Sequence, residues 1–162
     1  MAKLIIIRAT QQSGKTTTAG IVYQELLKYA DKSHSFNNEN VENDNLKYGK
    51  DGETIDFIAV LTVNGQKIGL ISEGDIARSV KEKIEILLKI DVAVIICCAR
   101  SIDRVGSTYR MMKNDYSKTH PIAFEIFTEY SNDEKLKFDI KKEIVDKVVA
   151  KTLSFVKYNT NC

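Results

Sequence analysis

The chain has few of the residues that build metal sites or disulfide frameworks. Its 162 residues include three cysteines, two histidines, one proline and no tryptophan. There is no Cys-x-x-Cys pair, and His34 and His120 lie far apart in the sequence, so we expect no zinc site. Cys97 and Cys98 lie inside an apolar run, where cysteine acts as a small core residue. This cysteine usage suits a reducing compartment and predicts a cytoplasmic protein.

Long apolar runs and an excess of one charge are also missing. The N-terminal apolar run Leu4–Ile7 ends at Arg8, and no run in the chain approaches the ~18 residues that span a membrane. The 24 basic and 22 acidic residues give a net charge of +2, which does not favour nucleic acid as the main partner. We therefore expect neither a membrane nor a nucleic acid as partner, and a single domain over residues 1–162.

What the sequence does contain is an alternation of strand and helix patterns. Short β-branched runs predict buried strands, and apolar residues at a spacing of three or four predict helices. The dipeptide Asn64-Gly65 between two apolar runs predicts a β-hairpin with a type I′ turn. The expected strands are 3–8, 54–63, 66–72, 91–99 and 122–128, and the expected helices are 15–30, 76–90 and 133–158, with a weakly helical stretch over 102–116. This order predicts an α/β fold with three layers and a mostly parallel sheet, in which one antiparallel hairpin strand lies at an edge.

Two further expectations concern a loop and a helix face. The segment Ser33–Glu53 is rich in Asn, Asp, Glu, Lys and Gly, which predicts a long, mobile loop. In the last expected helix, the four-residue spacing of Leu136, Ile140, Ile144 and Val148 predicts the buried face.

A phosphate-binding motif joins the first expected strand to the first expected helix. Its sequence is Ala9-Thr10-Gln11-Gln12-Ser13-Gly14-Lys15-Thr16, which follows G-x-x-x-x-G-K-[ST] except for the alanine at the first position. Backbone N–H groups of such a loop surround phosphate oxygens, and the helix N-terminus adds a partial positive charge. The alternative is that Gly-Lys-Thr only opens a helix. The complete strand–loop–helix order disfavours that alternative.

The end of this motif carries the expected binding residues. Gly14 lets the backbone approach an anion, Lys15 should reach the terminal phosphates, and Thr16 should coordinate Mg²⁺. Thr17 is placed to contact an inner phosphate, and Ala9 fits the loop if its φ is negative. The expected nucleotide-binding residues are Gln12, Ser13, Gly14, Lys15, Thr16 and Thr17.

On these residues the chain resembles the P-loop NTPase superfamily, and its layout is similar to two branches. One is the Ras-like GTPases, in which a long loop after the first helix leads into a hairpin whose second strand delivers an acidic residue to Mg²⁺. The corresponding stretch here is Val63–Asp75. The other comprises the nucleotide kinases and kinase-like ATPases, which supply arginines from the segment after a core strand. The motif is specific to the superfamily, and the two branches stay open.

Acidic and hydroxyl groups near the hairpin are the next candidates. Glu73 and Asp75 follow an expected strand, and in a parallel sheet the ligand site lies beyond the carboxyl ends of the strands. Glu73 is a candidate Mg²⁺ ligand and Asp75 a candidate catalytic carboxylate, although Asp75 could instead only cap the next helix. By the GTPase resemblance, Thr54 could sense the terminal phosphate, or it could simply begin a strand.

Arginines follow the fourth expected strand. Arg100 comes directly after that strand, where a guanidinium can stabilise charge on a transferring phosphoryl group, so it is a candidate catalytic residue with Lys15 and Asp75. Arg104 and Arg110 come later on a polar segment, where solvated side chains are the commoner outcome.

The base preference and the reaction are inferred from what accompanies the motif. No Asn-Lys-x-Asp sequence, which reads guanine in the Ras-like branch, occurs in the chain. We therefore predict a Mg²⁺-dependent ATP-binding protein that transfers or hydrolyses the terminal phosphoryl group, with an acceptor or protein partner that the sequence does not name. The alternatives are a Ras-like GTPase switch that binds a protein partner and a nucleotide-binding module without catalysis.

Overall fold

The computed structural model describes residues 1–10, 14–37, 42–43, 46, 48–52, 54–128 and 132–157. In these residues the chain forms a seven-stranded sheet, in the order β3-β2-β4-β5-β6-β1-β7, and four helices. The strands are β1 (Lys3–Ala9), β2 (Lys32–Asn37), β3 (Glu42–Asn43), β4 (Phe57–Val63), β5 (Gln66–Ile71), β6 (Val94–Arg100) and β7 (Ile122–Thr128). The helices are α1 (Lys15–Leu27), α2 (Ala77–Lys89), α3 (Thr108–Asp115) and α4 (Glu134–Phe155). The α/β class is confirmed.

The centre of the sheet is parallel. Strand β1 lies between β6 and β7 and is parallel to both, and β5 is parallel to β6. The residues Leu4–Ile7 of β1 are completely buried, because side chains on both faces of this strand are covered by helices. The carboxyl ends of these four strands therefore meet at one edge of the sheet, where a ligand site is expected.

The other side of the sheet is antiparallel and larger than expected. Within the described residues, β4 is antiparallel to β5, β2 to β4, and β3 to β2. The expectation of one antiparallel strand at an edge is therefore wrong, as is the expectation of an unbroken loop over 33–53. Pairing with β4 supplies backbone hydrogen bonds that override the polar composition of β2. Residues 38–41, 44–45, 47 and 53 of that expected loop lie outside the described part of the chain.

The hairpin and its turn are confirmed. Asn64 and Gly65 connect β4 to β5 with φ values of 53° and 76°, as a type I′ turn requires. Strand β4 begins at Phe57, three residues later than expected.

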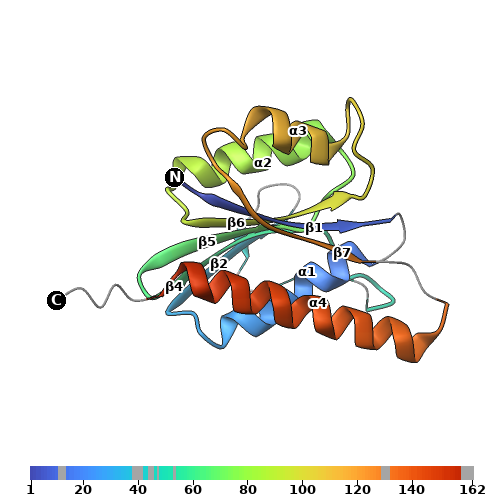
Figure 1. Ribbon diagram of the computed structural model, residues 1–162. Coiled ribbons are helices and arrows are strands. Elements are labelled where there is room, and N and C mark those ends of the chain that lie inside the picture. Colours follow the sequence, from blue (N-terminus) through green and yellow to red (C-terminus); the bar gives the residue numbers. More distant parts are fainter. Residues whose placement is uncertain are drawn as a thin grey trace.

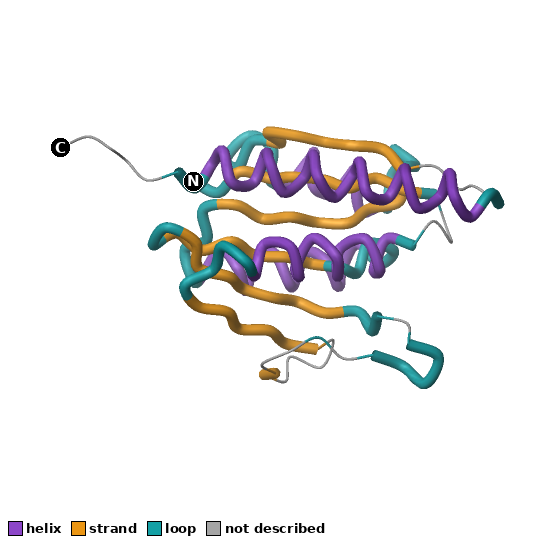
Figure 2. Tube along the Cα trace, turned by 90° about the horizontal axis from the view of Figure 1, so that it is seen from below, coloured by secondary structure: helices purple, strands orange, loops and turns teal. Residues whose placement is uncertain are grey.

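Helices cover both faces of the sheet (Figure 1). Helices α2 and α3 lie on one face and α1 and α4 on the other, and Figure 2 shows α1 and α4 side by side in front of the strands. One cluster of buried side chains lies under α1 and α4, and a second lies under α2 and α3. No described helix is both long and apolar enough to cross a bilayer.

The first turns of α4 extend past the edge of the sheet (Figures 1 and 2). Asp133 caps this helix by accepting hydrogen bonds of 3.0 Å from the backbone N–H groups of Lys135 and Leu136. Ile144 and Val148 are buried as expected, but Leu136 is 51% exposed because no strand lies beneath it. The expected buried face is therefore wrong at its N-terminal end.

Candidate phosphate-binding site

The turn into α1 has the backbone that a phosphate loop needs at its end. Helix α1 begins at Lys15, and Gly14 before it has a left-handed φ of 79° with no side-chain cap on the helix. A side chain at this φ would be strained, so glycine is required. Ala9 is the last residue of β1, and the non-glycine residues with positive φ in the described chain are Asn64 and Asp91. The alanine therefore has the negative φ that it needs.

Part of the expected binding set cannot be placed. Gln12 and Ser13 lie outside the described residues. Thr17 is exposed in the first turn of α1. Gly14, Lys15 and Thr16 are therefore the motif residues around which the site is built.

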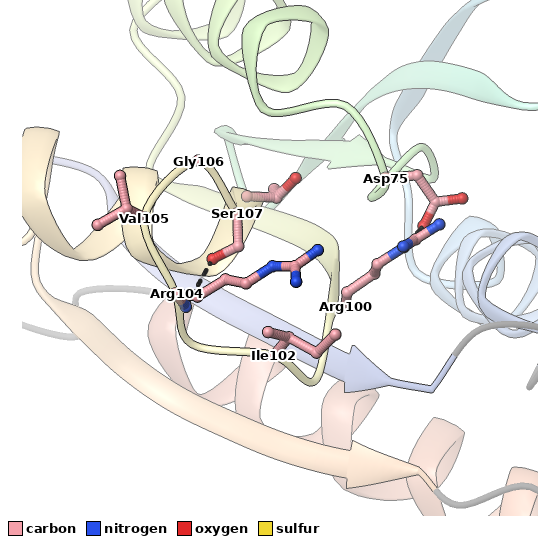
Figure 3. Close-up of a pocket in the computed structure, with 8 residues that line it drawn as sticks. Asp75, Arg100, Ile102, Arg104, Val105, Gly106 and Ser107 are labelled. Atoms are coloured by element: carbon pink, nitrogen blue, oxygen red, sulfur yellow. Dashed lines mark hydrogen bonds and ion pairs between the residues drawn. The ribbon is translucent and has the colours of Figure 1, made fainter.

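Lys15, Asp75 and Arg100 lie together at the carboxyl edge of the sheet. The Lys15 ammonium is 3.3 Å from Oδ1 of Asp75, and Nε of Arg100 is 3.1 Å from the same oxygen. The Lys15 side chain is only 9% exposed, whereas that of Asp75 is 50% exposed. The three expected catalytic residues thus form one cluster in which two cations share one carboxylate (Figure 3 shows Asp75 and Arg100).

Gly74 explains how Asp75 reaches Lys15. Strand β6 lies between β5 and β1, so the chain must cross the end of β6 after it leaves β5. A Cβ on Gly74 would lie 2.7 Å from the carbonyl carbon of Cys98 and 2.9 Å from the backbone nitrogen of Ala99. Glycine is needed for this close crossing, which brings Asp75 over the end of β6.

The two cations also set the ionisation of Asp75. Partial burial by itself would raise the pKa of this carboxyl. The hydrogen bond from Arg100, together with the charge and hydrogen bond of Lys15, outweighs burial and holds the pKa of Asp75 below its usual value. Asp75 is therefore a carboxylate at neutral pH.

A second carboxylate, which the sequence reasoning missed, lies beside Thr16. The Thr16 hydroxyl donates a 2.5 Å hydrogen bond to Oδ1 of Asp56, and the buried Ser72 hydroxyl lies 3.3 Å from the same oxygen. Asp56 directly precedes β4, which is antiparallel to β5, so its position is at the same edge as the end of β5. An acidic residue at the start of an antiparallel hairpin was the signal that could have identified it.

Glu73 has other partners. It forms an ion pair with Lys83 of α2 and accepts a 2.8 Å hydrogen bond from the Ser79 hydroxyl, and its side chain is only 13% exposed. None of its polar contacts in the described chain reaches Thr16. The structure thus brings Asp56, and not Glu73, next to the threonine expected to bind Mg²⁺. The metal role of Glu73 stays a prediction.

A second lysine approaches the end of the loop from α4. The Lys141 ammonium lies 3.5 Å from the position that a Cβ would take on Gly14. Burial and the charge of Lys137 lower the pKa of Lys141, against a smaller opposing effect of Glu134. No sequence pattern indicated this residue, because its position depends on how α4 lies against α1.

The remaining candidates, Arg110, Arg104 and Thr54, differ in whether their side chains have hydrogen-bond or ion-pair partners. Nε of Arg110 is 2.6 Å from Oδ1 of Asp103, so this arginine is paired within its own loop. Arg104 makes no side-chain hydrogen bond or ion pair with the described residues. Thr54 lies against α1, with its Oγ1 3.3 Å from where a Cβ on Gly20 would be.

The described residues contain no cluster of three or more His, Cys, Asp or Glu side chains that could hold a metal ion. A Mg²⁺ site completed by phosphate oxygens and water does not need such a cluster. Comparisons of the chain with protein-family models, with curated proteins and with solved structures find no match.

Proposed function

We propose that the protein binds ATP with Mg²⁺ at the turn between β1 and α1 and transfers the terminal phosphoryl group to an acceptor. One observation carries the proposal: Lys15, Thr16, Asp56, Asp75 and Arg100 gather beside the left-handed Gly14, at the N-terminus of a helix. Lysine, threonine and helix-terminal N–H groups that converge on one point are suited to phosphates. The interpretation of the fold as a P-loop domain, with helices on both faces of the sheet, belongs to the same proposal.

The ion pairs around Asp75 support an anion site. Its carboxylate lies within 3.3 Å of two cations, Lys15 and Arg100. An incoming phosphate offers these cations a stronger partner, because phosphate carries more charge and more acceptor oxygens than a carboxylate. Lys141 adds a third cation, whose ammonium group lies next to Gly14. The nucleotide would therefore displace Asp75 from both cations and release its carboxylate toward the acceptor.

The donors near Thr16 fit a magnesium ion. Hydroxyl and carboxylate oxygens are the ligands that Mg²⁺ prefers, and Thr16 and Asp56 place one of each within 2.5 Å of each other. Thr16 would hold the ion directly, and Asp56 would hold it directly or through a water molecule. When bound, Mg²⁺ neutralises charge on the terminal phosphates.

The residues of the chain account for a phosphoryl transfer. An acceptor oxygen forms a bond to the terminal phosphorus while the bond to the bridging oxygen breaks, and ADP leaves with the electron pair. Lys15 and Arg100 stabilise the charge on the transferring group. The proton of the acceptor passes to the carboxylate of Asp75 once its two cations have turned to the phosphates. If water is the acceptor, the same arrangement hydrolyses ATP.

The first test is Lys15→Ala with Lys28→Ala as a matched control. Each change removes one lysine: Lys15 is the first residue of α1, and Lys28 is its C-cap. Lys28 lies at the far end of the helix, where its ammonium is 3.0 Å from Oε2 of Glu25. Titration calorimetry with MgATP should show binding to the control and a loss of about 1.5–3 kcal/mol in the Lys15 variant. Equal affinity in both variants, with unchanged circular dichroism, would reject the assignment of the phosphate site.

The alternatives separate in the same samples. Release of phosphate or phosphoryl transfer from bound ATP distinguishes an enzyme from a binding module without catalysis. Preference for GTP, with a conformational response in the segment that leads to Thr54, would favour the GTPase switch instead.

A further inference from the structure

A cavity opens directly beside the cluster of Lys15, Asp75 and Arg100. It has a volume of about 360 Å³ and is lined by Asp75 and Arg100 on one side and by residues 102 and 104–108 on the other. Figure 3 shows these residues around one space, with Asp75 across from the loop that joins β6 to α3. Asp75 and Arg100 therefore belong both to this cavity and to the cluster that contains Lys15.

The cavity holds one cation without a partner in the described chain. Arg100 is paired with Asp75, and Arg110 is paired with Asp103. The Arg104 side chain, in contrast, extends into the space toward Arg100 (Figure 3). Asp75, the one acidic residue of the lining, is already shared between Lys15 and Arg100, so the cavity presents an excess of positive charge.

A buried hydroxyl in the lining also lacks a partner. Thr108 is 2% exposed, and its Oγ1 makes no hydrogen bond with any described residue. Burial of an unpaired hydroxyl costs roughly 1–3 kcal/mol. A valine would fill the same volume without this cost, and a ligand in the cavity that reaches the hydroxyl would remove it.

The N-terminus of α3 also indicates an anion site, and neighbouring residues hold its first turn in place. The Ser107 hydroxyl caps this helix by accepting a hydrogen bond from the backbone N–H of Arg110. Tyr109 is stacked on the guanidinium of Arg8 at 3.6 Å and donates a 2.8 Å hydrogen bond to Glu125. The first turn of α3 is therefore fixed against β1 and β7. A fixed helix N-terminus favours anions.

We propose that this cavity binds the phosphoryl acceptor and that the acceptor is a small phosphate monoester. Its phosphate group lies at the N-terminus of α3, between Arg104 and the Thr108 hydroxyl. This inference rests on the proposed function, since it names the substrate class for the same reaction. Several donors that converge on one point suit the three free oxygens of a phosphate monoester.

The acceptor reacts through a hydroxyl at its other end. That oxygen bonds to the terminal phosphorus of ATP, the bond to ADP breaks, and the hydroxyl proton goes to Asp75. Arg104 and Thr108 hold the acceptor but take no part in the bond changes. They are therefore expected to act on acceptor binding and not on nucleotide binding.

The test is an amide NMR titration of the full chain with inorganic phosphate, with sodium acetate as a second probe. Phosphate should shift the amides of residues 106–109 in the wild-type protein and also in Lys15→Ala, and acetate should shift them less at equal concentration. Arg104→Gln and Thr108→Val should each weaken phosphate binding at these amides about tenfold. Arg78→Gln, on the exposed face of α2, removes the same charge away from the cavity and serves as the charge-matched control.

The outcomes separate this inference from the proposed function. The amides of residues 14–18 report the phosphate loop, and those of residues 106–109 report the cavity. Shifts at the loop alone, or equal phosphate affinity in Arg104→Gln and Arg78→Gln, would overturn the acceptor site and leave the nucleotide site standing. Thr108→Val should melt at the wild-type temperature or above it, because its hydroxyl has no partner to lose. A clear drop in melting temperature would show instead that the hydroxyl has a structural role.

Discussion

The Thr16 hydroxyl donates a 2.5 Å hydrogen bond to Oδ1 of Asp56, a residue forty positions further along the chain. Thr16 is the second residue of α1, and Asp56 directly precedes β4. The contact depends on the antiparallel direction of β4, which places the start of that strand at the carboxyl edge of the parallel strands. It joins the phosphate motif to the hairpin and identifies the carboxylate closest to the expected Mg²⁺ position.

Asp56→Asn should weaken the response of ATP binding to Mg²⁺. The amide keeps an oxygen that can accept the Thr16 hydrogen bond, but it loses the charge that attracts the ion. We expect the Mg²⁺ concentration for half-maximal ATP binding to rise about tenfold or more. A Mg²⁺ titration at fixed ATP, followed by calorimetry, measures this shift.

Glu73→Gln should lower stability and change the Mg²⁺ response less than Asp56→Asn does, because Glu73 is already paired with Lys83. The Lys83 and Glu73 side chains are 7% and 13% exposed, so the change leaves a buried ammonium without its counter-charge. We expect the free energy of unfolding to fall by about 1–3 kcal/mol, as measured by urea denaturation. A normal Mg²⁺ response in Asp56→Asn with a weakened one in Glu73→Gln would favour Glu73 over Asp56 as the Mg²⁺ ligand.

Asp75→Asn should bind tripolyphosphate more tightly than the wild type at pH 7, because the carboxylate no longer competes for Lys15 and Arg100. Turnover should fall, since the proton acceptor is gone.

The pKa of Asp75 is held below its usual value of about 3.9. Its contribution to stability is therefore present above that value and is lost as the pH falls through the lower, folded-state pKa.

The pH dependence of the free energy of unfolding tests whether the two cations stabilise the Asp75 carboxylate. The difference in free energy of unfolding between wild type and Asp75→Asn should be constant from about pH 7 to 5 and shrink below about pH 4. Denaturant unfolding at a series of pH values measures it. A difference that grows on acidification would mean that the Asp75 carboxylate is not stabilised by its two cations.

Much of the fold could be predicted because its elements carry local signals. The β-branched residues of β1 and β6 and the turn Asn64-Gly65 each specify their own structure. Strand β2 could not be predicted, because it is polar and depends on the edge of β4 for its hydrogen bonds. Leu136 has the right spacing for a buried face, but nothing in the sequence shows where α4 passes the end of the sheet.

The site residues, too, include some that the sequence predicts and some that it does not. Lys15 and Thr16 follow from a motif whose residues are contiguous, and the clustering of Asp75 and Arg100 follows from the rule that functional residues lie at the carboxyl ends of parallel strands. Lys141 and the partner of Glu73 depend on helix packing, which residue spacing does not encode. Asp56 lies between these cases, since the hairpin prediction already implied its edge.

The protein should not select GTP strongly over ATP. Guanine selectivity in the Ras-like branch depends on an Asp that accepts two hydrogen bonds from the base, and its Asn-Lys-x-Asp motif is missing here. A good bidentate pair contributes roughly 1–3 kcal/mol of discrimination, by analogy with base-edge readout in nucleic acids. Competition between ATP and GTP at equal Mg²⁺ measures the preference. A GTP preference above about tenfold, or ~1.4 kcal/mol, would promote the switch hypothesis.

Lys141→Met should weaken tripolyphosphate binding without destabilising the protein. The ammonium lies next to Gly14 and has no ion pair with the described residues. Burial lowers its pKa, so the folded protein holds this charge at a cost that an anion would relieve. Methionine keeps most of the side-chain volume and removes the charge. The free energy of unfolding without ligand should therefore stay the same or rise, while the affinity should fall by about 1.5–3 kcal/mol.

Lys142→Met is the matched control for this change. Lys142 is the next residue of α4 and is exposed, so its loss changes the net charge equally without touching the end of the loop. Calorimetry with tripolyphosphate should distinguish the two variants by about tenfold or more. Equal losses in both would mean that α4 acts only through its overall charge. No loss in either would mean that Lys141 lies beside the loop without contacting the phosphates, and the site would then depend on Lys15 and Arg100 for its positive charge.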